Sequence, residues 1–301
     1  MTRVAVVGRG VVADRLRRVA APHDVVEADL AADVVVLAVG GDHVAAAARH
    51  VQAGTNVVST SGALDDVRQL VELDDEARAN GVSLVVGAAV SPGLSGLIAR
   101  HLVSTLAGCD ELHISVHGTA GPACAREHHQ ALQGWAVGWH DDGWIERSPA
   151  GSGRELCWFP EPVGARDCYR GELPDPLLLH RSFPDIGRIS ARVSATRRDR
   201  FTARLPMLSP PHREGGIGAL RVEARGHDER GARLTLVQGV AELIGTAAAA
   251  VAASFVDVLA DGGLGRGVVT AGDESLPTST LLRAVARRGV RLQAFTGIPS
   301  G

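Results

Sequence analysis

The fold follows from one stretch near the start of the chain, Val4-Ala5-Val6-Val7-Gly8-Arg9-Gly10-Val11-Val12-Ala13. Its apolar, β-branched beginning is typical of a strand buried on both faces, and residues 14–20 can continue as a helix. Between them lies the pattern Gly-x-Gly-x-x-Ala. Gly8 allows a sharp turn, Gly10 lets a ligand approach the backbone, and Ala13 lets the helix pack closely on the strand. The N–H groups of the first helical turn then face an anion, which predicts a dinucleotide site.

Strands and helices alternate over the first third of the chain. We expect strands at residues 24–29, 33–41, 56–61 and 82–89, with helices at 42–53 and 64–79. This alternation predicts an α/β fold with a parallel, doubly wound, Rossmann-like sheet. Only residues 30–32 separate the first two of these strands, whereas a crossover between parallel strands needs about a dozen residues. We therefore expect a trimmed sheet that lacks the usual third strand and its helix.

The ligand of such a sheet binds beyond the carboxyl ends of the strands. We expect NAD or NADP at a rim that includes Gly8, Arg9, Gly10, Val11, Gly40, Ser61 and Ala88. An acid at the end of the second strand would hold the adenosine ribose and favour NAD, and Glu27 and Asp29 are the candidates. Arg9 could instead reach a 2′-phosphate and favour NADP, so both nucleotides remain open.

The middle of the chain has a shorter, alternating periodicity. A strand at residues 111–117, and a hairpin of 219–225 and 232–237 around a polar turn, predict an inserted α+β second domain with an antiparallel sheet. We expect a dinucleotide-binding domain at residues 1–107 and the second, substrate-binding domain at 108–239. Residues 240–301 are expected to return to the first domain as helices and a strand.

Loops of the second domain place Arg and His beside Gly and Pro, a composition typical of functional loops. Arginine makes planar, bidentate contacts with carboxylates, so Arg126, Arg154 and Arg198 are candidates for a clamp on the substrate. Histidine titrates near neutral pH, so His128 and His129 are candidates for the general acid or base. Surface or core histidines without a catalytic role remain the alternative.

The same segments contain candidate metal ligands and thiols. Cys124 and His128 have a Cys-x-x-x-His spacing, and Cys157 and Cys168 could complete a zinc site. There is no Cys-x-x-Cys motif, and buried free cysteines are common, so no metal is expected. The sequence contains no lysine, which excludes Schiff-base catalysis and a lysine general acid.

Composition narrows the class of protein and its partners. The 301 residues carry a formal net charge of −3 and 3% aromatic residues, without a basic block, so no nucleic-acid partner is expected. No apolar segment is long enough to cross a bilayer, and a strand beginning near Arg3 leaves no room for a signal peptide. With four cysteines that do not form a disulfide framework, a cytoplasmic protein is expected. An exposed face of the second sheet favours a homodimer.

Several of these segments resemble the saccharopine dehydrogenase-like oxidoreductases. The resemblance rests on residues 32–36, 53–58, 80–82 and 87–95 in the first part, and on 267–269, 276–289 and 290–292 near the end. It covers residues 1 to about 107 and about 240 to 301. It implies NAD(P)-linked hydride transfer at an amine or imine carbon of a small, anionic, amino-acid-like substrate. The alternative is a Rossmann-like protein that has lost its cofactor and serves as a ligand-binding or scaffold subunit.

Overall fold

Six parallel strands form the sheet that begins with the N-terminal stretch. A computed structural model of the chain describes residues 1–26, 31–205, 207 and 214–295. The strands are β1 (Arg3–Val7), β2 (Asp24–Val26), β3 (Val34–Leu37), β4 (Asn56–Ser59), β5 (Ser83–Val86) and β14 (Gly267–Thr270). Their order is β14-β5-β4-β3-β1-β2, and every neighbouring pair runs parallel. The predicted α/β fold with a parallel sheet is confirmed.

The sheet is trimmed at the β2 edge. β2 ends at Val26 and β3 begins at Val34, and these two strands flank β1 on opposite sides. The short connection between them leaves no length for a crossover helix and a further strand. Residues 27–30, which include the ribose-binding candidates Glu27 and Asp29, lie outside the described residues.

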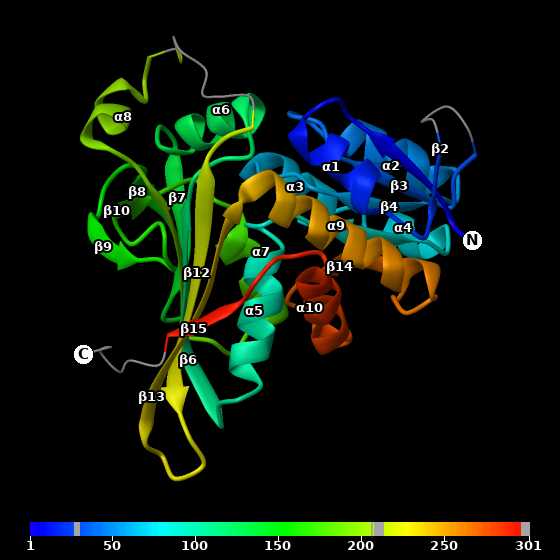
Figure 1. The fold of residues 1–301 in the computed structure, drawn as a ribbon. Coiled ribbons are helices and arrows are strands. Elements are labelled where there is room, and N and C mark those ends of the chain that lie inside the picture. Colours follow the sequence, from blue (N-terminus) through cyan, green and yellow to red (C-terminus); the bar gives the residue numbers. More distant parts are fainter. Residues whose placement is uncertain (27–30, 206, 208–213, 296–301) are drawn as a thin grey trace.

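Helices cover both faces of the parallel sheet (Figure 1). One face packs against α2 (Val44–Gln52), α3 (Leu64–Val71) and α4 (Asp74–Ala79). The other packs against α1 (Val11–Val19), α5 (Leu94–Val103), α9 (Ile244–Ala260) and α10 (Thr278–Arg287). The single helix expected at 64–79 is interrupted between Val71 and Asp74. We call the parallel sheet and these helices the first lobe.

A second, larger sheet forms the core of the second lobe. Its strands are β6 (Gly108–His117), β7 (Trp135–His140), β8 (Gly143–Pro149), β9 (Glu155–Trp158), β10 (Ala165–Arg170), β11 (Arg188–Ser194), β12 (Ile217–His227), β13 (Arg233–Leu243) and β15 (Gln293–Phe295). The predicted hairpin is β12 and β13. The sheet is mixed rather than antiparallel throughout, because the long connection from β6 to β11 brings the chain back to pair in parallel. The lobe also contains α6 (Pro122–Ala131), α7 (Asp175–Ser182) and α8 (Arg197–Thr202).

One continuous apolar core joins the two lobes. α5 and α9 lie between the two sheets (Figure 1), and their buried side chains contact both. The last part of the chain serves both sheets, because β14 pairs with β5 and β15 pairs with β13. Among the described residues, no helix is both long and apolar enough to cross a membrane.

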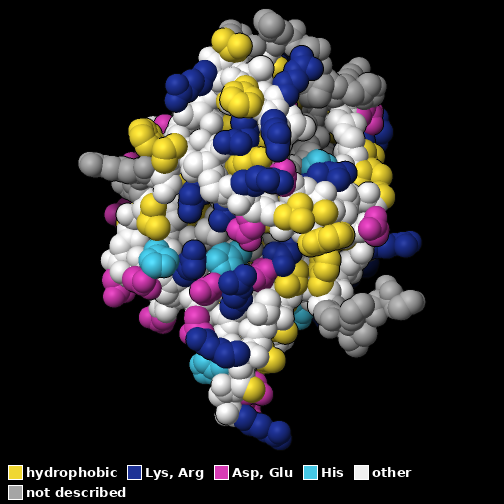
Figure 2. Space-filling model, turned by 90° about the vertical axis from the view of Figure 1, so that its left-hand side faces the viewer, with side chains coloured by type: hydrophobic (Ala, Val, Ile, Leu, Met, Phe, Trp, Pro, Cys, Tyr) yellow, Lys and Arg dark blue, Asp and Glu magenta, His cyan; other side chains and the backbone are white. Residues whose placement is uncertain are grey.

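The outer face of the second sheet carries many charged side chains (Figure 2) beside exposed hydrophobic ones such as Leu156 and Trp158. Figure 2 views the molecule from this side, where arginine and acidic side chains lie intermixed. Glu111 accepts hydrogen bonds from His113 at 2.8 Å and from Arg225 at 3.2 Å. Arg192 forms an ion pair with Glu155 at 2.8 Å. Opposite charges thus compensate one another both within a strand and between strands of this face.

Candidate active site

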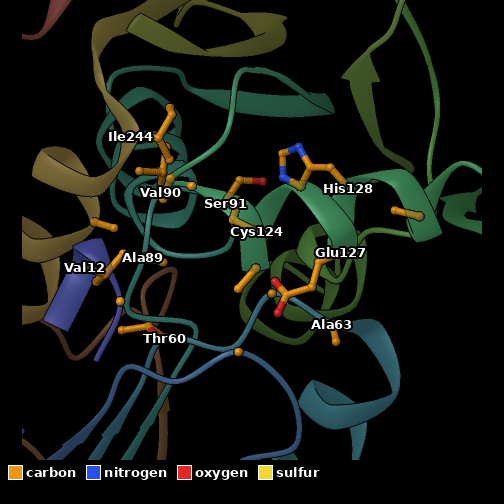
Figure 3. Close-up of a pocket in the computed structure, with 18 of the residues that line it drawn as sticks. Val12, Thr60, Ala63, Ala89, Val90, Ser91, Cys124, Glu127, His128 and Ile244 are labelled. Carbon is orange, nitrogen blue, oxygen red and sulfur yellow. The ribbon is translucent and has the colours of Figure 1, made fainter. Parts of the chain in front are cut away.

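A cavity of about 440 Å³ lies between the lobes at the carboxyl edge of the parallel sheet. Its first-lobe wall consists of residues 9–12 after β1, 38–40 after β3, 60 and 62–65 after β4, and 89–91 after β5. Its second-lobe wall is formed mainly by α6, together with the end of β6 and the start of α9. Figure 3 shows side chains from both lobes converging on this space. The position agrees with the general rule for ligands of doubly wound sheets.

The two glycines of the N-terminal turn have different surroundings. Gly8 has φ +139°, and a Cβ there would lie 2.2 Å from the carbonyl oxygen of Ala38. Gly10 is the N-cap of α1 with φ −90°, and a Cβ there would meet nothing within 4 Å. No side chain caps α1, and Val11 and Val12 of its first turn line the cavity. This open, uncapped helix end fits a pyrophosphate, because its N–H groups lack intrahelical partners.

The other predicted cofactor residues are divided between the wall and the interior. Arg9, Gly10, Val11 and Gly40 line the cavity. A Cβ on Gly40 would lie 2.8 Å from the Cβ of Ala123, so α6 packs directly on the end of β3. Ser61 and Ala88 are buried at the ends of their strands but off the wall. The buried Ser61 hydroxyl has no hydrogen-bond partner among the described residues.

Three titratable side chains of α6 face the cavity together. Cys124, Glu127 and His128 share one helical face because they are spaced by three and four residues. Burial lowers the pKa of His128, against the opposing charges of Glu127 and Asp175, so the imidazole is neutral at neutral pH. Burial raises the pKa of Cys124 to about 11, which leaves an unreactive thiol. A neutral imidazole that lines the cavity can accept a proton from a bound ligand.

A buried carboxylate that does not itself line the cavity holds one residue of the cavity wall in place. Asp175, at the start of α7, is 1% exposed and accepts hydrogen bonds of 2.6 Å from both Ser91 Oγ and Ser95 Oγ. Burial raises its pKa, and the two hydroxyls oppose that rise. Ser91 lines the cavity, and in Figure 3 its hydroxyl points toward the His128 ring. Asp175 thus fixes the loop after β5 against the second lobe.

A second cavity, of about 830 Å³, adjoins the first within the second lobe. His117, Gly118 and His128 line both cavities, so His128 lies where they meet. His129 lines only the second cavity, and its Nε2 donates to the carbonyl of Leu205 at 2.9 Å. Two arginines, Arg166 and Arg197, are also on its wall. The adjacent histidines of α6 therefore share the second cavity, and only His128 also reaches the first.

The three arginines predicted as a carboxylate clamp lie elsewhere. Arg126, Arg154 and Arg198 are exposed, and none of them lines either cavity. Arg154 forms an ion pair with Asp167 at 3.0 Å, which raises its pKa. Their role as a clamp stays a prediction without support from the geometry. Two other arginines of the second lobe, Arg166 and Arg197, line the second cavity, and Arg197 directly precedes Arg198 in the sequence.

The cysteines of the zinc alternative are separated in space. Cys124 faces the interlobe cavity, whereas Cys157 and Cys168 are buried with Phe159 and Val163 in a small apolar cluster of the second lobe. All four cysteines are free thiols. Within the part of the chain that the structure describes, no group of three or more His, Cys, Asp or Glu side chains is arranged to hold a metal ion.

Sequence reasoning missed two residues of this site. Glu127 had a signal, because it shares the helical face of Cys124 and His128. Asp175 had none, because more than 80 residues separate it from Ser91 and only the packing of α7 brings them together. Contacts between lobes of this kind are not encoded in local periodicity.

No protein-family model matches the sequence, and no curated protein sequence matches it. Among solved structures, apo saccharopine dehydrogenase (L-Glu forming) from Saccharomyces cerevisiae is similar, with a TM-score of 0.67 over 98% of this chain and 100% of that chain at 13% identity. A meso-dapdh mutant with DAP from Clostridium tetani E88 gives 0.47 over 93% and 96% at 15% identity. GenD2 from gentamicin A biosynthesis, in complex with NAD, gives 0.44 over 98% and 97% at 15% identity. The first of these establishes that this chain has the fold of saccharopine dehydrogenase.

Proposed function

We propose that the protein is an NAD(P)-dependent oxidoreductase that transfers hydride at an amine or imine carbon of a small, amino-acid-like substrate. The observation that carries the proposal is the opening of the uncapped N-terminus of α1 at Gly10 into the same cavity as His128. A helix N-terminus suited to a pyrophosphate and a neutral imidazole suited to proton transfer therefore line the same cavity. The fold, which matches that of saccharopine dehydrogenase, agrees with this assignment.

The residues around Gly10 would hold the nucleotide. The first-turn N–H groups of Val11 and Val12 would bind the pyrophosphate, and the exposed Arg9 is placed for a further phosphate. When bound, the nicotinamide supplies the hydride acceptor, and its reduced form supplies the donor in the reverse direction.

His128 would manage the proton. In the direction of amine oxidation, its neutral imidazole accepts a proton from the substrate ammonium. The nitrogen lone pair is then free to form the C=N bond as hydride leaves the carbon. In the reverse direction, the imidazolium returns the proton to the nitrogen. Ser91, held by Asp175, fixes the floor of the cavity beside the imidazole.

The second cavity suits the anionic part of the substrate. It meets the first cavity at His128, and its wall includes Arg166, Arg197 and the hydroxyls of Ser194 and Thr196. Guanidinium groups and hydroxyls are the usual partners of a carboxylate. A substrate with its reacting nitrogen near His128 would thus extend its carboxylate toward these arginines.

Calorimetric titration of the purified protein with NADH and NADPH tests the proposal. We expect micromolar binding of one of them, and we expect Gly10→Leu to weaken it by more than about tenfold. The matched control is Gly265→Leu, which also enters open space but lies near the start of β5, at the opposite edge of the sheet. Amino acids are then screened for reduction of NAD⁺ or NADP⁺, and His128→Asn should remove turnover while nucleotide affinity persists.

Absence of binding by either nucleotide would contradict the proposal. It would favour the alternative in which the fold retains ligand recognition without a redox cofactor. An equal loss of nucleotide affinity in Gly10→Leu and Gly265→Leu would show that the pyrophosphate does not bind at the N-terminus of α1.

A further inference from the structure

The charged side chains around the interlobe cavity are mainly acidic. Asp65, Glu127 and Glu172 line it, whereas Arg9, which is the one guanidinium that the described residues contribute to its wall, belongs to the predicted nucleotide turn. Asp65 is exposed and forms an ion pair with Arg68 at 3.6 Å. Glu172 is half-buried, and burial together with the charge of Asp65 raises its pKa. The potential beside these three acids therefore favours a positive group over an anion.

Glu127 is the acid that reaches farthest between the lobes. Its Oε1 lies 3.8 Å from the position that a Cβ on Gly40 would occupy, and its Oε2 lies 3.9 Å from the position that a Cβ on Gly62 would occupy. In Figure 3 the carboxylate projects from α6 into the cavity, close to Ala63. The Glu127 carboxylate thus occupies the gap between the ends of β3 and β4, on the same helical face as His128.

This carboxylate forms no ion pair with another residue that the structure describes, although Arg126 and His128 attract it from a greater distance. It is half-buried, the backbone N–H of Gly41 bonds to it, and its pKa is raised chiefly by burial. None of the ion pairs between described residues includes it. A carboxylate withdrawn from water without a cation is unfavourable, and such a group becomes stable when a ligand supplies the missing positive charge.

We propose that Glu127 is the anchor of an ammonium subsite and selects substrates that carry a protonated amine at this end of the cavity. The subsite lies in the cavity of the proposed function and rests on it for the reaction performed there. Glu172 and Asp65 add negative potential at its mouth, and the neutral His128 does not repel the cation. The substrate nitrogen would then sit between Glu127, which holds its charge, and His128, which takes its proton.

Binding of three probes of equal length tests the subsite. The probes are 1,5-diaminopentane, 1,5-pentanediol and glutarate, titrated at constant ionic strength and followed by protein NMR or calorimetry. We expect the diamine to bind to the wild-type protein and the diol and glutarate to bind at least about tenfold more weakly at this position. Glu127→Gln should weaken the diamine by at least about tenfold, which is about 1.4 kcal/mol. Glu127→Asp should restore part of that affinity.

Two controls separate this role from others. Glu229→Gln makes the same chemical change on the exposed β12–β13 turn and should leave diamine affinity unchanged. Unfolding of each variant by urea confirms that the fold is intact, and Glu127→Gln should be at least as stable as the wild-type protein because it removes a buried charge.

Three outcomes would overturn the inference. The first is preferential binding of glutarate or the diol, and the second is diamine binding that Glu127→Gln does not weaken. The third is a loss of NADH or NADPH affinity in Glu127→Gln with diamine affinity retained, which would assign the carboxylate to the nucleotide. Because the diamine is titrated without nucleotide, failure of the wild-type protein to bind NADH and NADPH would refute the proposed function and leave the ammonium subsite supported.

Discussion

Although Gly8 and Gly10 are two residues apart, their substitution should have different effects. A larger residue at Gly8 should lower the stability of the fold, whereas one at Gly10 should chiefly affect ligand access. Gly8→Ala places a methyl group 2.2 Å from the Ala38 carbonyl oxygen at φ +139°. Backbone strain of this kind costs about 1–3 kcal/mol, and overpacking costs about 1–3 kcal/mol more. We therefore expect Gly8→Ala to lower the free energy of unfolding by about 2–6 kcal/mol. At about 2 °C for each kcal/mol in a chain of this size, its Tm should fall by about 4–12 °C.

Gly10→Ala should behave differently because its Cβ meets no atom within 4 Å and its φ of −90° suits any residue. Reduced freedom of the unfolded chain favours alanine by about 0.4–1 kcal/mol, whereas the N-cap position favours glycine by a similar amount, about 0.5–1 kcal/mol. The net change in the free energy of unfolding should stay within about 0.5 kcal/mol. Urea and thermal unfolding of both variants beside the wild-type protein measure the difference. Equal destabilisation by the two substitutions would show that the turn is packed differently from the geometry described above.

Three further substitutions test the interior. His43 is fully buried between the Ser59 hydroxyl, at 2.8 Å, and a backbone carbonyl, and burial lowers its pKa below the ordinary 6.5. As the pH falls, the unfolded state therefore binds a proton before the folded state does. The stability that the neutral His43 provides above about pH 6.5 is lost as the pH falls toward the folded-state pKa. Urea unfolding at about pH 7.5 and 5.5 should therefore show a smaller decrease in the free energy of unfolding for His43→Asn than for the wild-type protein. Asp175→Ala removes the acceptor of two serine hydroxyls and should lower the free energy of unfolding by about 2–4 kcal/mol; a loss below about 1 kcal/mol would contradict the buried network. Phe255 of α9 is 0% exposed, so Phe255→Ala leaves a cavity in the shared core. This substitution should lower the free energy of unfolding by about 3–5 kcal/mol in the same assay. A near-neutral effect would show that α9 is not central to that core.

Local sequence determined the first lobe in large part. The apolar run before Gly8 forms β1, the small residues after it form the turn, and Val11 begins α1 as the pattern predicts. The short spacing before β3 correctly indicated a trimmed sheet, because a crossover requires a minimum length of chain. The β12–β13 hairpin was also readable, since its alternation and polar turn are local features.

Part of the candidate site was readable for the same reason. Arg9, Gly10, Val11, Gly40 and His128 were chosen from motifs and reach the cavity. Each lies at the end of a strand or on a helix whose direction the local pattern already sets. By contrast, the periodicity of the second domain does not show which arginines face inward, and the three selected as a clamp are exposed.

Tertiary structure alone decided how the two lobes meet. The parallel pairing of β6 with β11, the return of β15 to the second sheet and the placement of Asp175 beside Ser91 all join segments far apart in the chain. The approach of α6 to Gly40 is of the same kind, and it carries Glu127 into the gap between the strands. Local periodicity reports which face of an element is apolar, but not which partner covers that face. Those partners are selected by burial of the shared core around α5 and α9, a property of the whole chain.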